Sequence, residues 1–69
     1  MIDKFKGLRI YSDDFRSFGY CSRGIRQGFS DYDLSYADFL SDGIDAFELL
    51  CACESNALVL LVVEAKYGQ

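Results

Sequence analysis

Histidine, proline and tryptophan are all absent from this 69-residue chain. Histidine is the commonest general base and the commonest transition-metal ligand in proteins, so its absence removes the usual basis for acid–base catalysis and for zinc binding. A zinc site would need all three cysteines and a carboxylate, without any Cys-x-x-Cys spacing. We therefore expect a protein that is not an enzyme and that uses no metal and no cofactor.

Long hydrophobic runs are also missing. The longest apolar segment, residues 57–63, is too short to span a bilayer, and the N-terminus shows no signal peptide. The cysteines, Cys21, Cys51 and Cys53, are odd in number, which argues against a secreted disulfide framework. The sequence thus predicts a cytoplasmic protein with reduced thiols and no membrane association.

Basic residues are scarce in the second part of the chain. Residues 1–27 carry six Lys and Arg against three Asp, whereas residues 28–69 carry one Lys against eight Asp and Glu. The formal net charge is −4. Charge patterning bears on partners more than on fold. The asymmetry indicates a small protein with one basic face and one acidic face.

The length allows one domain, over residues 1–69. A hydrophobic content of 51% argues against disorder. A domain of this size buries only about 60% of its unfolded surface, so dimerisation is one way in which it could gain stability. Residues 1–9 show no clear periodicity, and we expect a flexible or extended lead-in there.

Two short helices are expected in the first half. Ser12 is a good N-cap and is followed by two aspartates that suit a helix N-terminus. Gly19 is expected to end this helix. Ser22 is the next N-cap candidate, and it opens a second helix.

The second helix has one apolar face. Ile25 and Phe29 lie four residues apart, which places them on the same side of a helix. Gly24 and Gly28 have the same spacing, and each weakens a helix by about 1 kcal/mol relative to alanine. We interpret these glycines as a sign that another element approaches the helix backbone closely.

The strongest local signals are two capping boxes ten residues apart. Ser35 with Asp38 forms the first, and Asp45 with Glu48 forms the second. Gly43 separates them. Each box is accompanied by a hydrophobic staple. The pattern predicts two consecutive short helices, the second ending near residue 53.

The last segment, residues 57–66, is capped by Ser55 or Asn56. Its centre, residues 58–63, is apolar on every side, so periodicity does not separate a buried helix from a strand. The valines favour a strand, whereas the preceding cap and the length favour a helix. We expect a helix, with the strand as the open alternative.

Together these segments predict an all-α fold, a compact bundle of about five short helices. The expected core consists of Phe15, Phe18, Ile25, Phe29, Leu34, Phe39, Leu40, Ile44, Phe47, Leu50, Leu58, Leu61 and Val62.

Acidic and tyrosine residues cluster in the middle of the chain. Tyrosine is favoured at protein interfaces, and carboxylates complement a basic partner. The expected partner-binding residues are Asp31, Tyr32, Asp33, Tyr36, Asp38, Asp42 and Asp45. The residues that could contact nucleic acid are Arg16, Arg23 and Arg26. Nucleic-acid binding is disfavoured, because the isoelectric point is about 4.4.

Three segments, residues 19–29, 33–44 and 62–66, together resemble a family of short proteins encoded by tailed phages and prophages. The distinctive pieces are Cys-x-x-Gly-x-x-x-x-Phe and Asp-Phe-Leu-x-x-Gly-Ile. The chain departs from the family's pattern at Asp31, Tyr36 and Ser55–Asn56. The resemblance implies a phage or mobile-element origin and a compact helical fold. It implies no activity, so no catalytic residue is carried over.

The expected function is that of a non-enzymatic, phage-encoded module in the host cytoplasm. It would bind a host or phage protein through its acidic face and inhibit or modulate a defence or regulatory protein. One alternative is a structural or morphogenesis protein that packs within the virion or tail. A second alternative is a small nucleic-acid-binding accessory protein.

Overall fold

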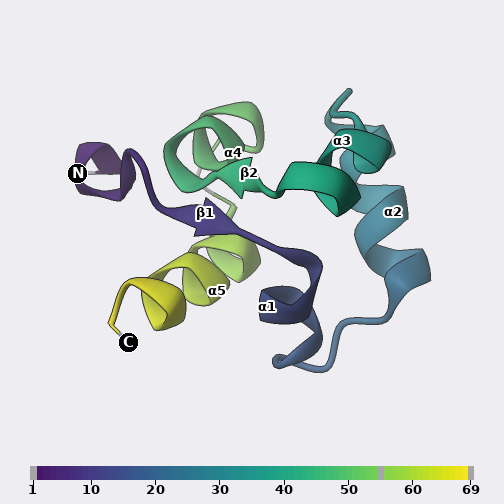
Figure 1. Cartoon of the computed structure of the whole chain (residues 1–69), viewed down its shortest axis with the longest axis horizontal. Coiled ribbons are helices and arrows are strands. Elements are labelled where there is room, and N and C mark those ends of the chain that lie inside the picture. The colour runs from purple at the N-terminus through teal and green to yellow at the C-terminus, as the bar shows by residue number, and fades with distance from the viewer. Residues whose placement is uncertain (1, 55, 69) are drawn as a thin grey trace.

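The computed structural model describes residues 2–54 and 56–68 (Figure 1). In chain order the elements are a 3-10 helix η1 (Ile2–Phe5), β1 (Arg9–Ile10), α1 (Ser12–Arg16), α2 (Ser22–Asp31), α3 (Tyr36–Asp42), β2 (Ile44–Asp45), α4 (Ala46–Ala52) and α5 (Ala57–Tyr67). The two strands cross the middle of the molecule, between α2 and α3 at one end and η1 at the other (Figure 1). The five predicted helices are confirmed, but the fold is mostly helical rather than purely all-α.

The departure from an all-α fold is a short antiparallel pair of strands. Ile10 lies opposite Ile44, and Arg9 lies opposite Asp45. Both isoleucines are buried, and the backbone N–H of Ala46 extends the pairing by donating to the carbonyl of Leu8 at 2.7 Å. Two-residue strands are too short to produce a period-2 pattern in the sequence. The strand pair was therefore not predicted.

The lead-in predicted over residues 1–9 is folded in its described part. Residues 2–5 form η1, and the Phe5 side chain is 1% exposed. The Phe5 ring meets the Tyr67 ring edge to face, at 5.2 Å between centroids. The N-terminal segment is thereby packed against the end of α5.

Three helix starts are confirmed. Ser35 Oγ accepts from the backbone N–H of Asp38 at 3.2 Å, and Asp45 Oδ2 accepts from two N–H groups of α4. Asn56 Oδ1 accepts from the N–H of Leu58 at 2.9 Å. Its alternative as a cap, Ser55, lies outside the described residues. Gly43 follows α3 with a φ of 76°, a conformation that favours glycine.

Two predicted N-caps are displaced by one residue. The cap of α1 is Tyr11 rather than Ser12, and the Asp14 carboxylate accepts from the Tyr11 N–H at 2.8 Å. The cap of α2 is Cys21 rather than Ser22, and its sulfur accepts from the Gly24 N–H at 3.4 Å. In both cases a group that is not a typical hydroxyl cap forms the bond, so residue preferences alone gave the wrong position.

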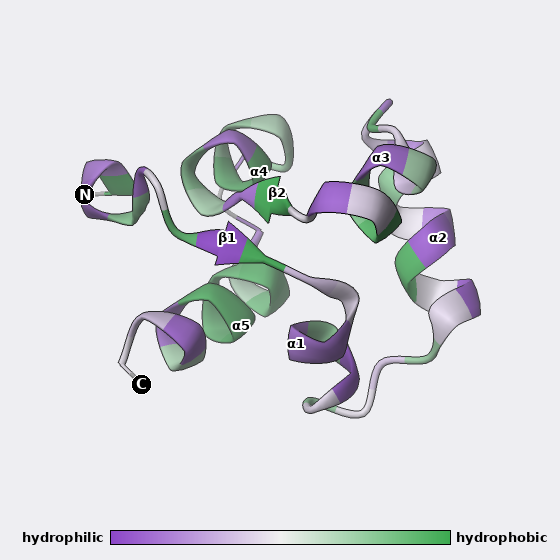
Figure 2. Cartoon of the chain, viewed as in Figure 1, coloured by the Kyte–Doolittle hydropathy of each residue, from purple (hydrophilic) through white to green (hydrophobic). Residues whose placement is uncertain are grey.

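The last segment is a helix, and the strand alternative over residues 58–63 is excluded. Figure 2 shows that α5 is hydrophobic over most of its length. Val62 and Val63 are buried, whereas Leu58 and Leu61 are 57% and 54% exposed. Within the single described chain, neighbouring elements thus cover only part of this apolar helix.

The core differs in part from the prediction. Phe18, Leu40, Leu58 and Leu61 are exposed, and Leu34 and Phe47 are only partly buried. Their places are taken by residues from β1, α4 and the ends of the chain. The observed core consists of Phe5, Ile10, Phe15, Ile25, Phe29, Phe39, Ile44, Ala46, Leu49, Leu50, Cys53, Val62 and Val63.

Aromatic rings join the first three helices. Phe29 and Phe39 lie 4.4 Å apart between centroids, and Phe15 meets Phe39 edge to face at 6.0 Å. Pairs with these separations stabilise a core beyond the effect of area burial. The cluster holds α2 and α3 together at one end of the molecule. Among the described residues, no helix is long and apolar enough to cross a membrane.

Candidate functional site

Four carboxylates lie around one hollow between α3, the strand pair and α4, which we call the acidic hollow. They belong to Asp33, Asp38, Asp42 and Glu48. The remaining lining comes from Arg9, Leu34, Ser35, Phe39, Gly43 and Ile44. Like charges gathered at one place produce a local negative potential.

The capping signals of the sequence position these carboxylates. Asp38 and Asp42 are four residues apart on α3, so they share one side of that helix. Asp33 precedes α3 and has a φ of 62°, in the left-handed region that aspartate tolerates better than most residues. Glu48 lies in the first turn of α4, which Asp45 caps. The residue before α3, the two ends of that helix and the first turn of α4 therefore contribute the four carboxylates to one hollow.

Arg9 is the basic residue of the acidic hollow. Its guanidinium donates at 3.0 Å to the backbone carbonyls of both Asp42 and Gly43. A cation at this position is favourable, because carbonyls at a helix C-terminus carry partial negative charge. Arg9 therefore stabilises the end of α3.

The acidic hollow has no ion pair within the described part of the chain. The two ion pairs of the described residues join Asp13 to Arg16 and Asp14 to Lys66, and none of these four residues lines the hollow. The carboxylates of the hollow are consequently available to a cationic partner.

The predicted partner surface is divided by the fold. Asp33, Asp38 and Asp42 come together, and Glu48, which was not predicted, joins them. Asp31 and Tyr32 instead line a separate apolar cavity. Prediction from sequence missed Glu48 because its position suggested only a capping role.

Asp45 is used by the fold. Its Oδ1 accepts from the backbone N–H of Gly7 at 2.6 Å, and its Oδ2 accepts from the N–H groups of Phe47 and Glu48 at 3.1 and 3.3 Å. The carboxylate thus caps α4 and ties it to the N-terminal segment. We assign Asp45 to the scaffold of the site.

Tyr36 also serves the scaffold. Its ring is partly buried and lies 6.0 Å from the Phe29 ring and 6.2 Å from the Phe39 ring. The same side chain lines a shallow depression that includes Asp33 and Arg26. Tyr36 therefore belongs to the aromatic cluster and is not among the residues that line the acidic hollow.

The predicted arginines do not form a uniform basic surface. Arg16 donates to Ser22 Oγ at 2.8 Å and pairs with Asp13 at 3.7 Å. Arg26 lines the same depression as Asp33, so an acidic residue partly offsets its charge. Arg23 lies on α2, three residues before Arg26.

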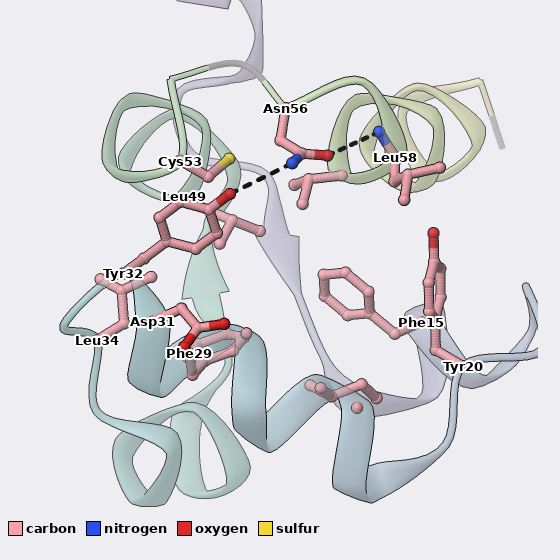
Figure 3. A pocket seen from close by; sticks show the side chains of 14 residues that line it. Phe15, Tyr20, Phe29, Asp31, Tyr32, Leu34, Leu49, Cys53, Asn56 and Leu58 are labelled. Atoms are coloured by element: carbon pink, nitrogen blue, oxygen red, sulfur yellow. Dashed lines mark hydrogen bonds between the residues drawn. The ribbon is translucent and has the colours of Figure 1, made fainter.

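The apolar cavity lies between α2, α4 and α5 and has a volume of about 250 Å³ (Figure 3). Phe15, Ile25, Phe29 and Leu49 of the core contribute to its walls. Further lining comes from Tyr20, Gly24, Gly28, Asp31, Tyr32, Leu34, Cys53, Asn56, Leu58 and Val59. One signal of this cavity was present in the sequence, the pair of glycines in α2, but we interpreted these glycines as a sign of close packing.

One hydrogen bond crosses the cavity at its edge. Asn56 Nδ2 donates to the hydroxyl oxygen of Tyr32 at 3.3 Å, and this bond joins the end of α2 to the start of α5 (Figure 3). Asp31 accepts from Gln27 Nε2 at 2.9 Å. Asp31 and Tyr32 thus place polar groups on one side of a largely apolar wall, and Tyr20 lies across from them (Figure 3).

The thiols are not gathered at either place. Cys21 and Cys51 are exposed, whereas Cys53 is buried and lines the apolar cavity. Within residues 2–54 and 56–68, no group of three or more acidic or cysteine residues has an arrangement that could hold a metal ion. Comparison of the chain with protein families, with curated proteins and with solved structures gives no match.

Proposed function

We propose that this chain is a non-catalytic binding module that docks on a basic surface of a partner protein through the acidic hollow. The observation that carries the proposal is the convergence of Asp33, Asp38, Asp42 and Glu48 on one hollow, away from the ion pairs of the described chain. Carboxylates arranged in this way attract lysine and arginine side chains, speed association and reject acidic partners.

The proposed setting is a host bacterium in which a phage or prophage encodes the chain. The resemblance noted in the sequence supports this setting, and the acidic surface fits an inhibitor that occupies a basic site of a defence or regulatory protein. Many such basic sites bind phosphate groups of nucleic acids, and a cluster of carboxylates offers them a similar charge. Inhibition would then follow from competition for one site.

The proposal is tested by capturing partners with a matched pair of variants. The hollow variant combines Asp33→Asn, Asp38→Asn, Asp42→Asn and Glu48→Gln. The control variant combines Asp3→Asn, Asp13→Asn, Glu54→Gln and Glu64→Gln, all at exposed positions outside the hollow. Each variant raises the formal net charge from −4 to zero, so the two have the same net charge and remove it at different places.

Immobilised wild-type and variant proteins are exposed to a bacterial lysate at low and high salt, and each recovered protein is then purified and its affinity measured. We expect a partner that wild type and control bind alike and that the hollow variant binds at least about tenfold more weakly. For an inhibitor, adding the chain also lowers the activity of the purified partner. Equal affinity of the hollow variant and the control would refute the proposal.

A second candidate function is packing within a virion or tail. The observation that favours it is the exposure of Leu58 and Leu61 on α5, which leaves apolar surface for another copy or another particle protein. Co-purification with assembled particles, lost on Leu58→Ser with Leu61→Ser and retained by the hollow variant, would support this function instead.

A further inference from the structure

The apolar cavity between α2 and α5 is separate from the acidic hollow. Leu34 is the only residue that lines both the apolar cavity and the acidic hollow among the described residues. The cavity therefore calls for an explanation of its own, beyond the proposed docking on a basic partner.

Two glycines of α2 help to keep this cavity open. Gly24 and Gly28 have ordinary helical φ values, so no turn requires them. A Cβ at Gly28 would meet no atom within 4 Å, and one at Gly24 would meet only the Cys21 sulfur at 3.7 Å. The close approach that we predicted is absent. In a helix glycine is less favourable than every residue except proline, so the fold alone does not account for this pair.

The size of the cavity defines what it can accept. An apolar cavity of about 150 Å³ admits benzene. The present volume of about 250 Å³ is larger and is sufficient for a group of one or two rings. Aromatic walls from Phe15, Tyr20 and Phe29 suit the face or edge of such a ring.

The polar groups of the cavity define the charge of the ligand. Asp31 is the only charged residue among those that line it, and its Oδ2 accepts no hydrogen bond from the described residues. The Tyr32 oxygen already accepts from Asn56, which leaves its own hydrogen free to donate. The walls thus offer one anionic acceptor beside an apolar surface.

We propose that the cavity binds a small ligand that combines an apolar ring with a cationic amine. The ring would lie against the aromatic and aliphatic walls, and the amine would face Asp31. A ring-bearing acid is the opposite case, since Asp31 would repel it. The proposal commits to a small molecule rather than to a second copy of the chain, because the charge of Asp31 specifies a cation at the wall of a ring-sized cavity.

Three probes of similar size test the proposal: 1-naphthylmethylamine, 1-naphthalenemethanol and 1-naphthoate. Each is titrated into the full chain and followed by two-dimensional amide NMR. We expect the amides of Gly24, Gly28 and Leu58 to shift, while Gly7 serves as the remote control. The amine is expected to bind about fivefold more tightly than the acid, the size expected for attraction and repulsion by one exposed carboxylate.

Variants locate the site. Asp31→Asn is expected to abolish the preference for the amine while retaining the neutral probe. Gly28→Leu fills the cavity and is expected to weaken all three probes at least about tenfold, whereas Ser30→Leu, an exposed change on the same helix, leaves them unchanged. The double variant Gly24→Ala with Gly28→Ala is the alternative to Gly28→Leu, because both added Cβ atoms have room.

Several outcomes would overturn the proposal. One is the absence of any shift at Gly24 and Gly28 with all three probes, and another is equal binding of amine and acid. Retained binding in a folded Gly28→Leu variant would place the ligand elsewhere. Shifts at these amides that depend on protein concentration without any probe would assign the cavity to a second copy of the chain.

Discussion

The ammonium nitrogen of Lys66 lies 3.1 Å from Asp14 Oδ1 and 3.3 Å from Asp14 Oδ2, and this ion pair joins the end of α5 to α1. The side chains are 27% and 16% exposed, so the pair is partly withdrawn from solvent. Asp14 Oδ2 also accepts from the Tyr11 N–H, which links the pair to the cap of α1. One carboxylate therefore connects a helix start with a helix that follows more than forty residues later in the chain.

The strength of this pair can be measured with a double-mutant cycle. We expect Asp14→Asn and Lys66→Met to show a coupling free energy of about 1 kcal/mol in urea unfolding, because solvent only partly screens the pair. The matched cycle uses Asp13→Asn and Arg16→Met, whose side chains are 90% and 50% exposed and whose charged atoms lie 3.7 Å apart. Its coupling is expected to stay below about 0.5 kcal/mol. Similar coupling free energies in the two cycles would contradict the expectation that the less exposed Asp14–Lys66 pair is the stronger one.

Asp45 is expected to contribute more to stability than an ordinary helix cap. Asp45→Ala removes the acceptor of three backbone N–H groups and should lower the free energy of unfolding by about 2 to 3 kcal/mol. Ser35→Ala removes a cap with one such bond and should cost about 1 kcal/mol. Urea unfolding of both variants checks the difference. Equal losses would mean that the Gly7 bond adds nothing.

The two aspartates of α3 are expected to differ in their effect on stability. Asp42→Asn should raise the free energy of unfolding by about 0.5 kcal/mol, because a negative charge in the last turn opposes the helix dipole. Asp38→Asn should change it less, because loss of a favourable charge in the first turn opposes relief of repulsion. Unfolding at low and high salt checks this ranking, and the difference should shrink as salt increases. A larger increase in the free energy of unfolding from Asp38→Asn than from Asp42→Asn would contradict this ranking.

Local signals predicted the helices well where side chains cap the backbone. Ser35, Asp45 and Asn56 each act on N–H groups two or three residues ahead, so neighbouring residues determine these starts. The displaced caps at Tyr11 and Cys21 show the limit of this approach. At α1 the Asp14 carboxylate accepts from the backbone N–H of the cap residue Tyr11, and at α2 the Cys21 sulfur accepts from the Gly24 N–H; neither bond comes from the serine that residue preferences favour as a cap.

The candidate site was less predictable than the helices. Asp33, Asp38 and Asp42 are close in sequence, so their grouping followed from local spacing. Glu48 reaches the same hollow only because β2 turns the chain between two helices. Asp31 is two residues from Asp33 but lines the apolar cavity, since α2 ends between them.

The amino-acid sequence by itself indicated the five α-helices, the excess of acidic charge and the caps at Ser35 and Asp45. These properties depend on interactions within one helical turn. Only the tertiary structure decided the strand pair of Ile10 with Ile44, the burial of Phe5 and the exposure of Leu58 and Leu61. It also decided which carboxylates share a hollow and left a cavity beside Gly28. The physical reason is that burial and clustering depend on contacts between residues distant in sequence, and local periodicity carries no information about those contacts.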